Sequence, residues 1–107
     1  MDVEEIRQYA LSKGEVEEGF PFGGDALVFK IKGKMFLLLM MSSSPVTFNA
    51  KCDPEKAMEW RERYSSVEPG YHMNKKHWNT VTVDGSLRRD QLKEMIDDSF
   101  QLVAKIK

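Results

Sequence analysis

The sequence predicts a two-layer α+β fold, in which helices from the N-terminal, middle and C-terminal parts of the chain pack on one face of an antiparallel β-sheet. Three segments with strand-like character, 26–32, 35–41 and 46–52, follow one another with short loops between them, as in an antiparallel meander. Segments with helical spacing of apolar residues stand before, between and after the strands. The length of 107 residues suits one compact unit, so we expect a single domain over residues 1–107.

The first element is predicted to be a short amphipathic helix. Asp2 and Glu5 have the spacing of a capping box, and Gly14 supplies a stop. Between them, apolar residues recur at helical spacing: Val3, Ile6, Ala10 and Leu11. The next segment, GFPFGG at 19–24, is too rich in glycine and proline for a helix interior. We expect a connector there with two aromatic anchors, Phe20 and Phe22, and with room for a short strand before it.

The meander follows from alternation and from one turn signal. In segment 26–32, ALVFKIK, apolar and basic residues alternate with the period of a strand that has one buried face. Gly33 makes a tight turn with Lys34, and the apolar run 35–41 returns as the partner strand. This run has seven residues, whereas a membrane span needs about 20, so we expect no membrane segment. The third strand, 46–52, places Phe48, Ala50 and Cys52 on one face.

Helices and one further strand are predicted in the second half. Asp53 and Pro54 start a helix whose stripe is Ala57, Trp60 and Tyr64. We expect a loop over 65–70 and a strand over 77–83, HWNTVTV, which is rich in β-branched and aromatic residues. The last helix carries an apolar stripe made of Leu92, Met95, Ile96, Ser99, Val103 and Ile106.

No pattern of catalytic or metal-binding residues stands out. Gly23 and Gly24 precede a strand instead of opening a helix, so they lack the context of a phosphate loop. His72 and His77 are five residues apart and lack the spacing of a zinc site. Cys52 shares a predicted strand face with Phe48, which favours a small core residue over a nucleophile. We therefore expect no enzymatic activity, no cofactor and no metal.

Charge is unevenly distributed along a chain whose formal net charge is −1. Residues 1–18 hold six acids against two bases, whereas 26–52 hold four lysines and no acid. The stretch 69–89 carries four bases against one acid. If the two basic segments meet in the fold, a nearly neutral protein presents a positive face. The single cysteine and the acidic, amphipathic N-terminus, which is unlike a secretory signal, suit a cytoplasmic protein.

The most informative segment is PGYHMNKKHW, residues 69–78, which gathers cations, hydrogen-bond donors and aromatic rings. Such a loop could grip phosphates through its lysines and stack through its rings. The alternative is that Tyr71 and Trp78 anchor the loop on the core while Lys75 and Lys76 keep its tip soluble.

These residues resemble the MmcQ/YjbR family of small bacterial proteins over essentially the whole chain. The resemblance rests on FPFG at 20–23, on FKI and GKMF around the tight turn, on Lys51 with Asp53-Pro54-Glu55, and above all on PGYHMNKKHW. Ser99-Phe100 and Leu102-Val103 are similar to the family's closing pattern. Two positions depart from it: Phe100 stands where a tyrosine is usual, and Arg88 stands where a proline is expected. The missing hydroxyl puts a polar role at position 100 in doubt.

The resemblance implies a frataxin-like fold and a DNA-binding role attributed to a double-wing arrangement of β-turns. It brings no catalytic residues. The residues it marks as nucleic-acid-binding are Lys30, Lys32, Lys34, His72, Asn74, Lys75, Lys76 and His77. On this hypothesis the protein is a non-enzymatic, monomeric module with DNA as its partner. The alternative is an interaction domain for an unidentified protein or a small ligand, in which the Pro69–Trp78 segment and the Phe20/Phe22 connector enclose a pocket.

Overall fold

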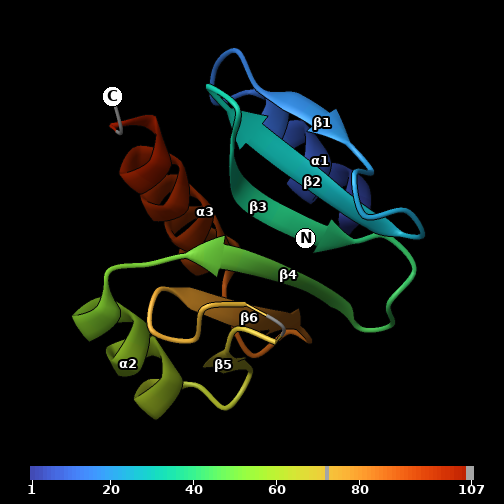
Figure 1. Cartoon of the computed structure of the whole chain (residues 1–107). Coiled ribbons are helices and arrows are strands. Elements are labelled where there is room, and N and C mark those ends of the chain that lie inside the picture. Colours follow the sequence, from blue (N-terminus) through green and yellow to red (C-terminus); the bar gives the residue numbers. More distant parts are fainter. Residues whose placement is uncertain (72, 106–107) are drawn as a thin grey trace.

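A computed structural model describes residues 1–71 and 73–105 and shows three helices and six strands in this part of the chain (Figure 1). The elements follow one another as α1 (Val3–Leu11), β1 (Glu17–Gly19), β2 (Ala26–Ile31), β3 (Lys34–Met40), β4 (Val46–Lys51), α2 (Pro54–Arg63), β5 (Val67–Pro69), β6 (Trp78–Val83) and α3 (Arg89–Ala104). The strands form one sheet in the order β1-β2-β3-β4-β6-β5, with every neighbouring pair antiparallel. The predicted α+β class and its antiparallel meander are confirmed.

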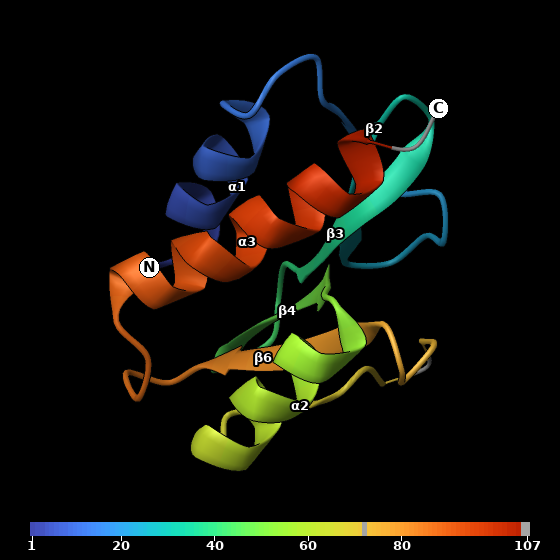
Figure 2. The ribbon, with the colours of Figure 1, turned by 90° about the vertical axis from the view of Figure 1, so that its left-hand side faces the viewer.

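The helices lie on one side of the sheet, as Figure 2 shows. The helix α3 crosses the middle of the sheet over β3 and β4, and α2 packs on β5 at one edge. The core between the layers is rich in aromatic rings, with Phe29, Phe36 and Phe48 fully buried. Cys52 is 6% exposed and belongs to the same core, as its predicted strand face indicated. Of the helices in the described part of the chain, none lies on the other face of the sheet.

Local sequence explains where the elements begin. The Asp2 carboxylate accepts a hydrogen bond from the Glu5 N–H, and the Glu5 carboxylate accepts one from the Asp2 N–H, which completes the predicted capping box. The Asp53 carboxylate caps α2 just before Pro54. The turn between β2 and β3 has two residues, Lys32 and Gly33, with φ angles of 54° and 78°. Positive φ at both positions is the conformation of the tightest hairpin turns.

The sheet ends in two short edge strands, one of which differs from the sequence prediction. β1 is the short strand for which the connector left room, and β5 lies inside the segment 65–70, which was predicted to be a loop. Each has three residues, too few for alternation to show, and each is held by pairing with one neighbour, β2 or β6. Ile106, predicted in the last helix, lies outside the described residues. No helix in the described part of the chain is both long and apolar enough to cross a bilayer.

Candidate nucleic-acid interface

The sheet topology brings the basic segments to one end of the molecule. The β2–β3 turn, the end of β4 and the start of β6 lie at the same end of the sheet, on the left in Figure 1. Lys51 closes β4 opposite Trp78, the first residue of β6, so it lies between the hairpin turn and the segment that precedes β6. We call this set the lysine row: Lys32, Lys34, Lys51, Lys75 and Lys76.

The hairpin turn contributes two cations in different settings. Lys32 Nζ donates a hydrogen bond of 3.2 Å to the carbonyl of Ala104, which draws the last turn of α3 towards the hairpin. Lys105, the next residue, is exposed there and adds a positive charge. Lys34 is exposed and makes no ion pair among the described residues. Lys34 is therefore the hairpin cation most open to a phosphate.

Lys30 lies outside the row, although the resemblance marked it. It is half-buried on β2 and sits directly opposite Glu17 of β1 in the strand register. Alternation places it on the face of the sheet away from the helices, because its neighbours Phe29 and Ile31 both belong to the core. With Glu17 facing it, Lys30 contributes less positive potential than the exposed Lys34.

Arg61 of α2 holds residues 69–78, which we call the signature segment, through hydrogen bonds from its guanidinium group. Its Nε donates to the side-chain oxygen of buried Asn79 at 2.7 Å. Its Nη2 donates to the carbonyls of Lys75 and Trp78, the latter at 3.1 Å. Gly70 joins the two ends of the segment, because its N–H donates to the Trp78 carbonyl at 2.8 Å. One guanidinium thus fixes the path of the chain into β6.

The polar residues of the segment mostly bond to the segment itself. The Asn74 side chain accepts from the Lys76 N–H at 3.0 Å, and its carbonyl accepts from the N–H groups of His77 and Trp78. Lys75 Nζ donates to the Gly70 carbonyl at 3.0 Å. Asn74 and Lys75 therefore shape the turn; both lysines are exposed, and Lys75 is the one whose ammonium group bonds to the segment.

The two histidines of the segment contribute little to a described binding surface. The His77 carbonyl accepts from the Cys52 N–H at 2.7 Å, so its backbone joins the segment to the end of β4. The side chain of His77 is half-buried. His72, also marked by the resemblance, lies outside the described residues.

The aromatic residues depart from the sequence interpretation. Tyr71 is 69% exposed, so its ring is not the buried anchor expected, whereas Trp78 is half-buried. The rings of Phe20 and Phe22 are 50% and 69% exposed, so the connector does not anchor them in the core either. Glycines leave that connector free to project, with φ angles of 74° and 62° at Gly23 and Gly24.

The expected pocket between connector and signature segment is absent from the arrangement of the described residues. The connector joins β1 to β2 at one edge of the sheet, whereas the segment joins β5 to β6 at the other edge and at the other end of the strands. The hollow beside Phe20, of about 410 Å³, is lined by β1, β2 and the connector, and by no residue of the segment. The idea of one enclosed pocket is therefore wrong, because it rested on a proximity that the strand order does not provide.

The charges at this end of the sheet suit an anion. Burial raises the pKa of the Cys52 thiol to about 11, so it stays protonated and a poor nucleophile at neutral pH. Among the described residues, no group of three or more His, Cys, Asp and Glu side chains could hold a metal ion. Two acids near the row already have partners: Asp53 caps α2, and Asp98 pairs with Lys56 at 2.6 Å.

Sequence reasoning missed two contributors to this end. Arg61 is one basic residue among several on α2, and its contacts lie 14 to 18 residues away, so no local pattern marks it. Lys51 stood out in the charge count but not among the marked residues, and only the β4–β6 pairing places it in the row.

Comparison with known proteins gives a consistent family. A model of the YjbR family matches residues 11–102. The uncharacterized protein YbdF of Escherichia coli O157:H7 is 40% identical over 100 residues, which cover 94% of this chain and 82% of that protein. The uncharacterized protein YjbR of Escherichia coli K12 is 32% identical over 101 residues, covering 94% of this chain and 86% of that protein.

Solved structures share the fold. A crystal structure of a Deinococcus radiodurans protein with a DUF419 domain superposes with a TM-score of 0.94 at 37% identity, over 98% of this chain and 80% of that one. A crystal structure of a Pseudomonas syringae protein gives a TM-score of 0.83 at 29% identity, over 96% and 99% of the two chains.

Proposed function

The chain belongs to the YjbR family, and we propose that it is a non-enzymatic, monomeric, cytoplasmic DNA-binding domain that grips the phosphate backbone with the lysine row. The observation that supports this proposal is the convergence of segments far apart in sequence. Hairpin turn, end of β4 and signature segment each bring lysines to one end of the sheet. A chain with a net charge of −1 thereby gains a basic end.

The two turns act as wings on either side of Lys51. All four of their lysines are exposed, but Lys32 and Lys75 are held partly by backbone carbonyls, which leaves Lys34 and Lys76 as the more available cations. Lysine recognises a phosphate as a point charge and does not read base edges, so binding should be nearly independent of sequence. With roughly four to six phosphate contacts, affinity should be low and should fall steeply with added salt.

A titration of a short fluorescent DNA duplex, followed by anisotropy at about 50 mM and about 200 mM salt, tests the proposal. We expect saturable binding at the lower salt and much weaker binding at the higher. Lys34→Glu/Lys76→Glu should weaken binding at least tenfold, because it replaces two attractive contacts with two repulsive ones.

Lys93→Glu is the matched control, since Lys93 lies on α3 beside the Tyr9 ring, away from the row, and the change in net charge per substitution is the same. It should leave binding within about twofold of the original. No binding by about 50 μM protein in low salt would overturn the proposal, as would equal losses in the control and the double variant.

A further inference from the structure

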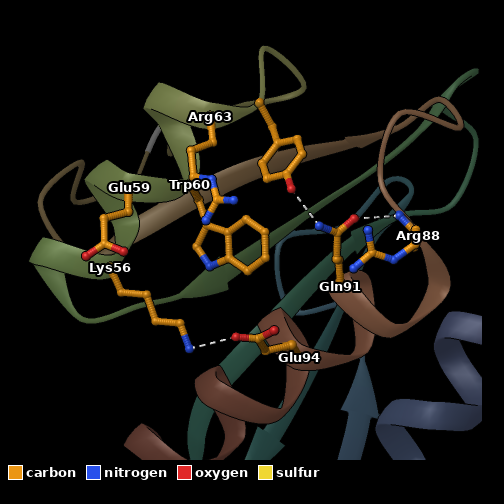
Figure 3. A pocket seen from close by; sticks show the side chains of 8 residues that line it. Lys56, Glu59, Trp60, Arg63, Arg88, Gln91 and Glu94 are labelled. Atoms are coloured by element: carbon orange, nitrogen blue, oxygen red, sulfur yellow. Dashed lines mark hydrogen bonds and ion pairs between the residues drawn. The ribbon is translucent and has the colours of Figure 1, made fainter.

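A separate hollow of about 370 Å³ lies between α2 and α3 (Figure 3). The helix α2 packs mainly on β5 and α3 mainly on β3 and β4, so long side chains bridge the gap between the helices. Lys56 Nζ pairs with the Glu94 carboxylate at 2.9 Å, and Gln91 Nε2 donates to the Tyr64 hydroxyl at 2.7 Å. Figure 3 shows the Trp60 indole between these two links. These two side-chain links thus bound the hollow, and the Trp60 ring forms its floor.

Two guanidinium groups converge on this floor from opposite rims. In Figure 3 the side chains of Arg63 and Arg88 both extend towards the Trp60 ring. Arg63 forms no ion pair within the described residues, and its Cζ lies 5.9 Å from the centre of the Tyr64 ring. Within the described residues Arg88 pairs with Asp90 alone, at 3.1 Å, and the two side chains are 71% and 73% exposed. So exposed a pair is weak, and both arginines are available to an anion.

The floor also offers hydrogen-bond donors. Trp60 is 9% exposed, and its buried Nε1 has no hydrogen-bond partner among the described residues. In Figure 3 this nitrogen lies on the ring edge that faces the Lys56–Glu94 link. The Tyr64 oxygen accepts from Gln91, which leaves the hydroxyl proton for another acceptor. An isolated buried donor is costly, so an acceptor at this place would be stabilising.

The carboxylates of the lining do not cancel these charges. Glu94 pairs with Lys56 at 2.9 Å and shares it with Asp98, at 2.6 Å, and in Figure 3 Glu59 points away from the Trp60 ring, on the side opposite Arg88. Three basic and two acidic side chains line the hollow in all. Arg63 and Arg88 are the two lining cations that pair with no described carboxylate of the hollow itself.

We propose that this hollow is a binding site for a small molecule that carries a carboxylate or a phosphate group. The anionic group lies between Arg63 and Arg88, where planar guanidinium groups suit its oxygens, and a planar body lies over Trp60 and Tyr64. The volume of about 370 Å³ falls within the range of ligand sites. No member of the lysine row lines the hollow, so this site is independent of the proposed DNA contact.

A titration followed by ¹H–¹⁵N NMR at constant ionic strength tests the site with four probes: inorganic phosphate, acetate, benzoate and adenosine 5′-monophosphate. Each is raised to about 10 mM, which covers millimolar dissociation constants. We expect saturable shifts of the Trp60 indole N–H and of the side-chain signals of Arg63 and Arg88. Benzoate against acetate, and the nucleotide against phosphate, show whether the ring adds affinity; phosphate against acetate shows which anion is preferred.

The variant Arg63→Gln/Arg88→Gln should bind the best probe at least tenfold more weakly, since it removes two charged hydrogen-bond donors. Both residues are exposed, and the same spectra report whether the variant is folded. Arg89→Gln is the control, because Arg89 neighbours Arg88 but pairs with Glu5 of α1 outside the hollow. The absence of saturable shifts with all four probes would overturn the proposal, and so would binding that the double variant keeps.

Discussion

The two turns of the basic end are stabilised differently, although each has one lysine, Lys32 or Lys75, bonded to a backbone carbonyl. In the segment before β6, the Arg61 guanidinium and Lys75 Nζ both turn inward to backbone carbonyls. In the β2–β3 hairpin the turn needs only two residues with positive φ, and Lys34 stays exposed. The polar groups of the signature segment therefore serve mainly to fix the path of the chain into β6. In the proposed function, the phosphate contacts fall mainly to Lys34, Lys51 and Lys76, whose ammonium groups form no ion pair among the described residues.

Removing the Arg61 hydrogen bonds should have the largest effect on stability. Arg61→Met leaves buried Asn79 and two carbonyls without their charged donor, and we expect the free energy of unfolding to fall by about 3 kcal/mol. Urea denaturation measures this. Arg63→Met, two positions along the same helix and exposed, should change stability by less than about 0.5 kcal/mol. Similar small losses of unfolding free energy in both variants would mean that the Arg61 hydrogen bonds do not stabilise the fold.

Adding a side-chain atom at Gly70 should have the next largest effect on stability. A Cβ atom on Gly70 would lie 2.9 Å from the Cβ atoms of Met73 and Trp78 and 3.1 Å from the Trp78 carbonyl oxygen. Gly70→Ala should therefore cost about 2 kcal/mol in thermal or urea unfolding. At Gly19 an added Cβ meets nothing within 4 Å, so Gly19→Ala should cost less than about 0.5 kcal/mol. A neutral Gly70→Ala would show that the segment has room to relax.

The hairpin should respond in the opposite direction. Lys32 has a φ of 54°, a conformation that side chains other than Asn and Asp rarely adopt without strain. Lys32→Asn should raise the unfolding free energy by about 0.5 kcal/mol, even though the exposed hydrogen bond to Ala104 is lost. The control is Lys34→Asn, which changes a residue of an extended strand. It should give no gain, and an equal gain in both variants would contradict the explanation from backbone strain.

The smallest effect should separate the adjacent lysines of the segment. Lys75→Gln should lower stability by about 0.5 kcal/mol, because its Nζ bonds to the Gly70 carbonyl, and Lys76→Gln should leave stability unchanged. For DNA affinity we expect the reverse order, with the larger loss in Lys76→Gln. Equal effects on both measurements would remove the distinction between an inward and an outward lysine.

Sequence reasoning located most of the fold because its signals are local. Alternation, the capping pair at Asp2 and Glu5, and Asp53-Pro54 mark elements that depend on their own residues. β1 and β5 exist through pairing with a neighbouring strand, so three residues alone do not show them. The prediction placed helices on one face of the sheet, and α1, α2 and α3 lie there (Figure 2).

The candidate site was harder to predict, because its geometry comes from the tertiary structure. The sequence singled out the signature segment, but only the contacts of Arg61 and Gly70 show that its polar groups mostly bond to one another. The lysine row depends on the strand order β2-β3-β4-β6, which brings Lys51 between the two turns. The hollow at Trp60 joins two helices that are separate in sequence.

The salt dependence of DNA affinity tests the central claim most directly. The slope of log affinity against log salt concentration counts the phosphates that the protein contacts, at roughly 0.9 per contact. If the lysine row makes these contacts, Lys34→Gln/Lys51→Gln/Lys76→Gln should reduce the magnitude of the slope by roughly 2.7. A slope equal to that of the original protein, or no measurable DNA binding at low salt, would contradict it.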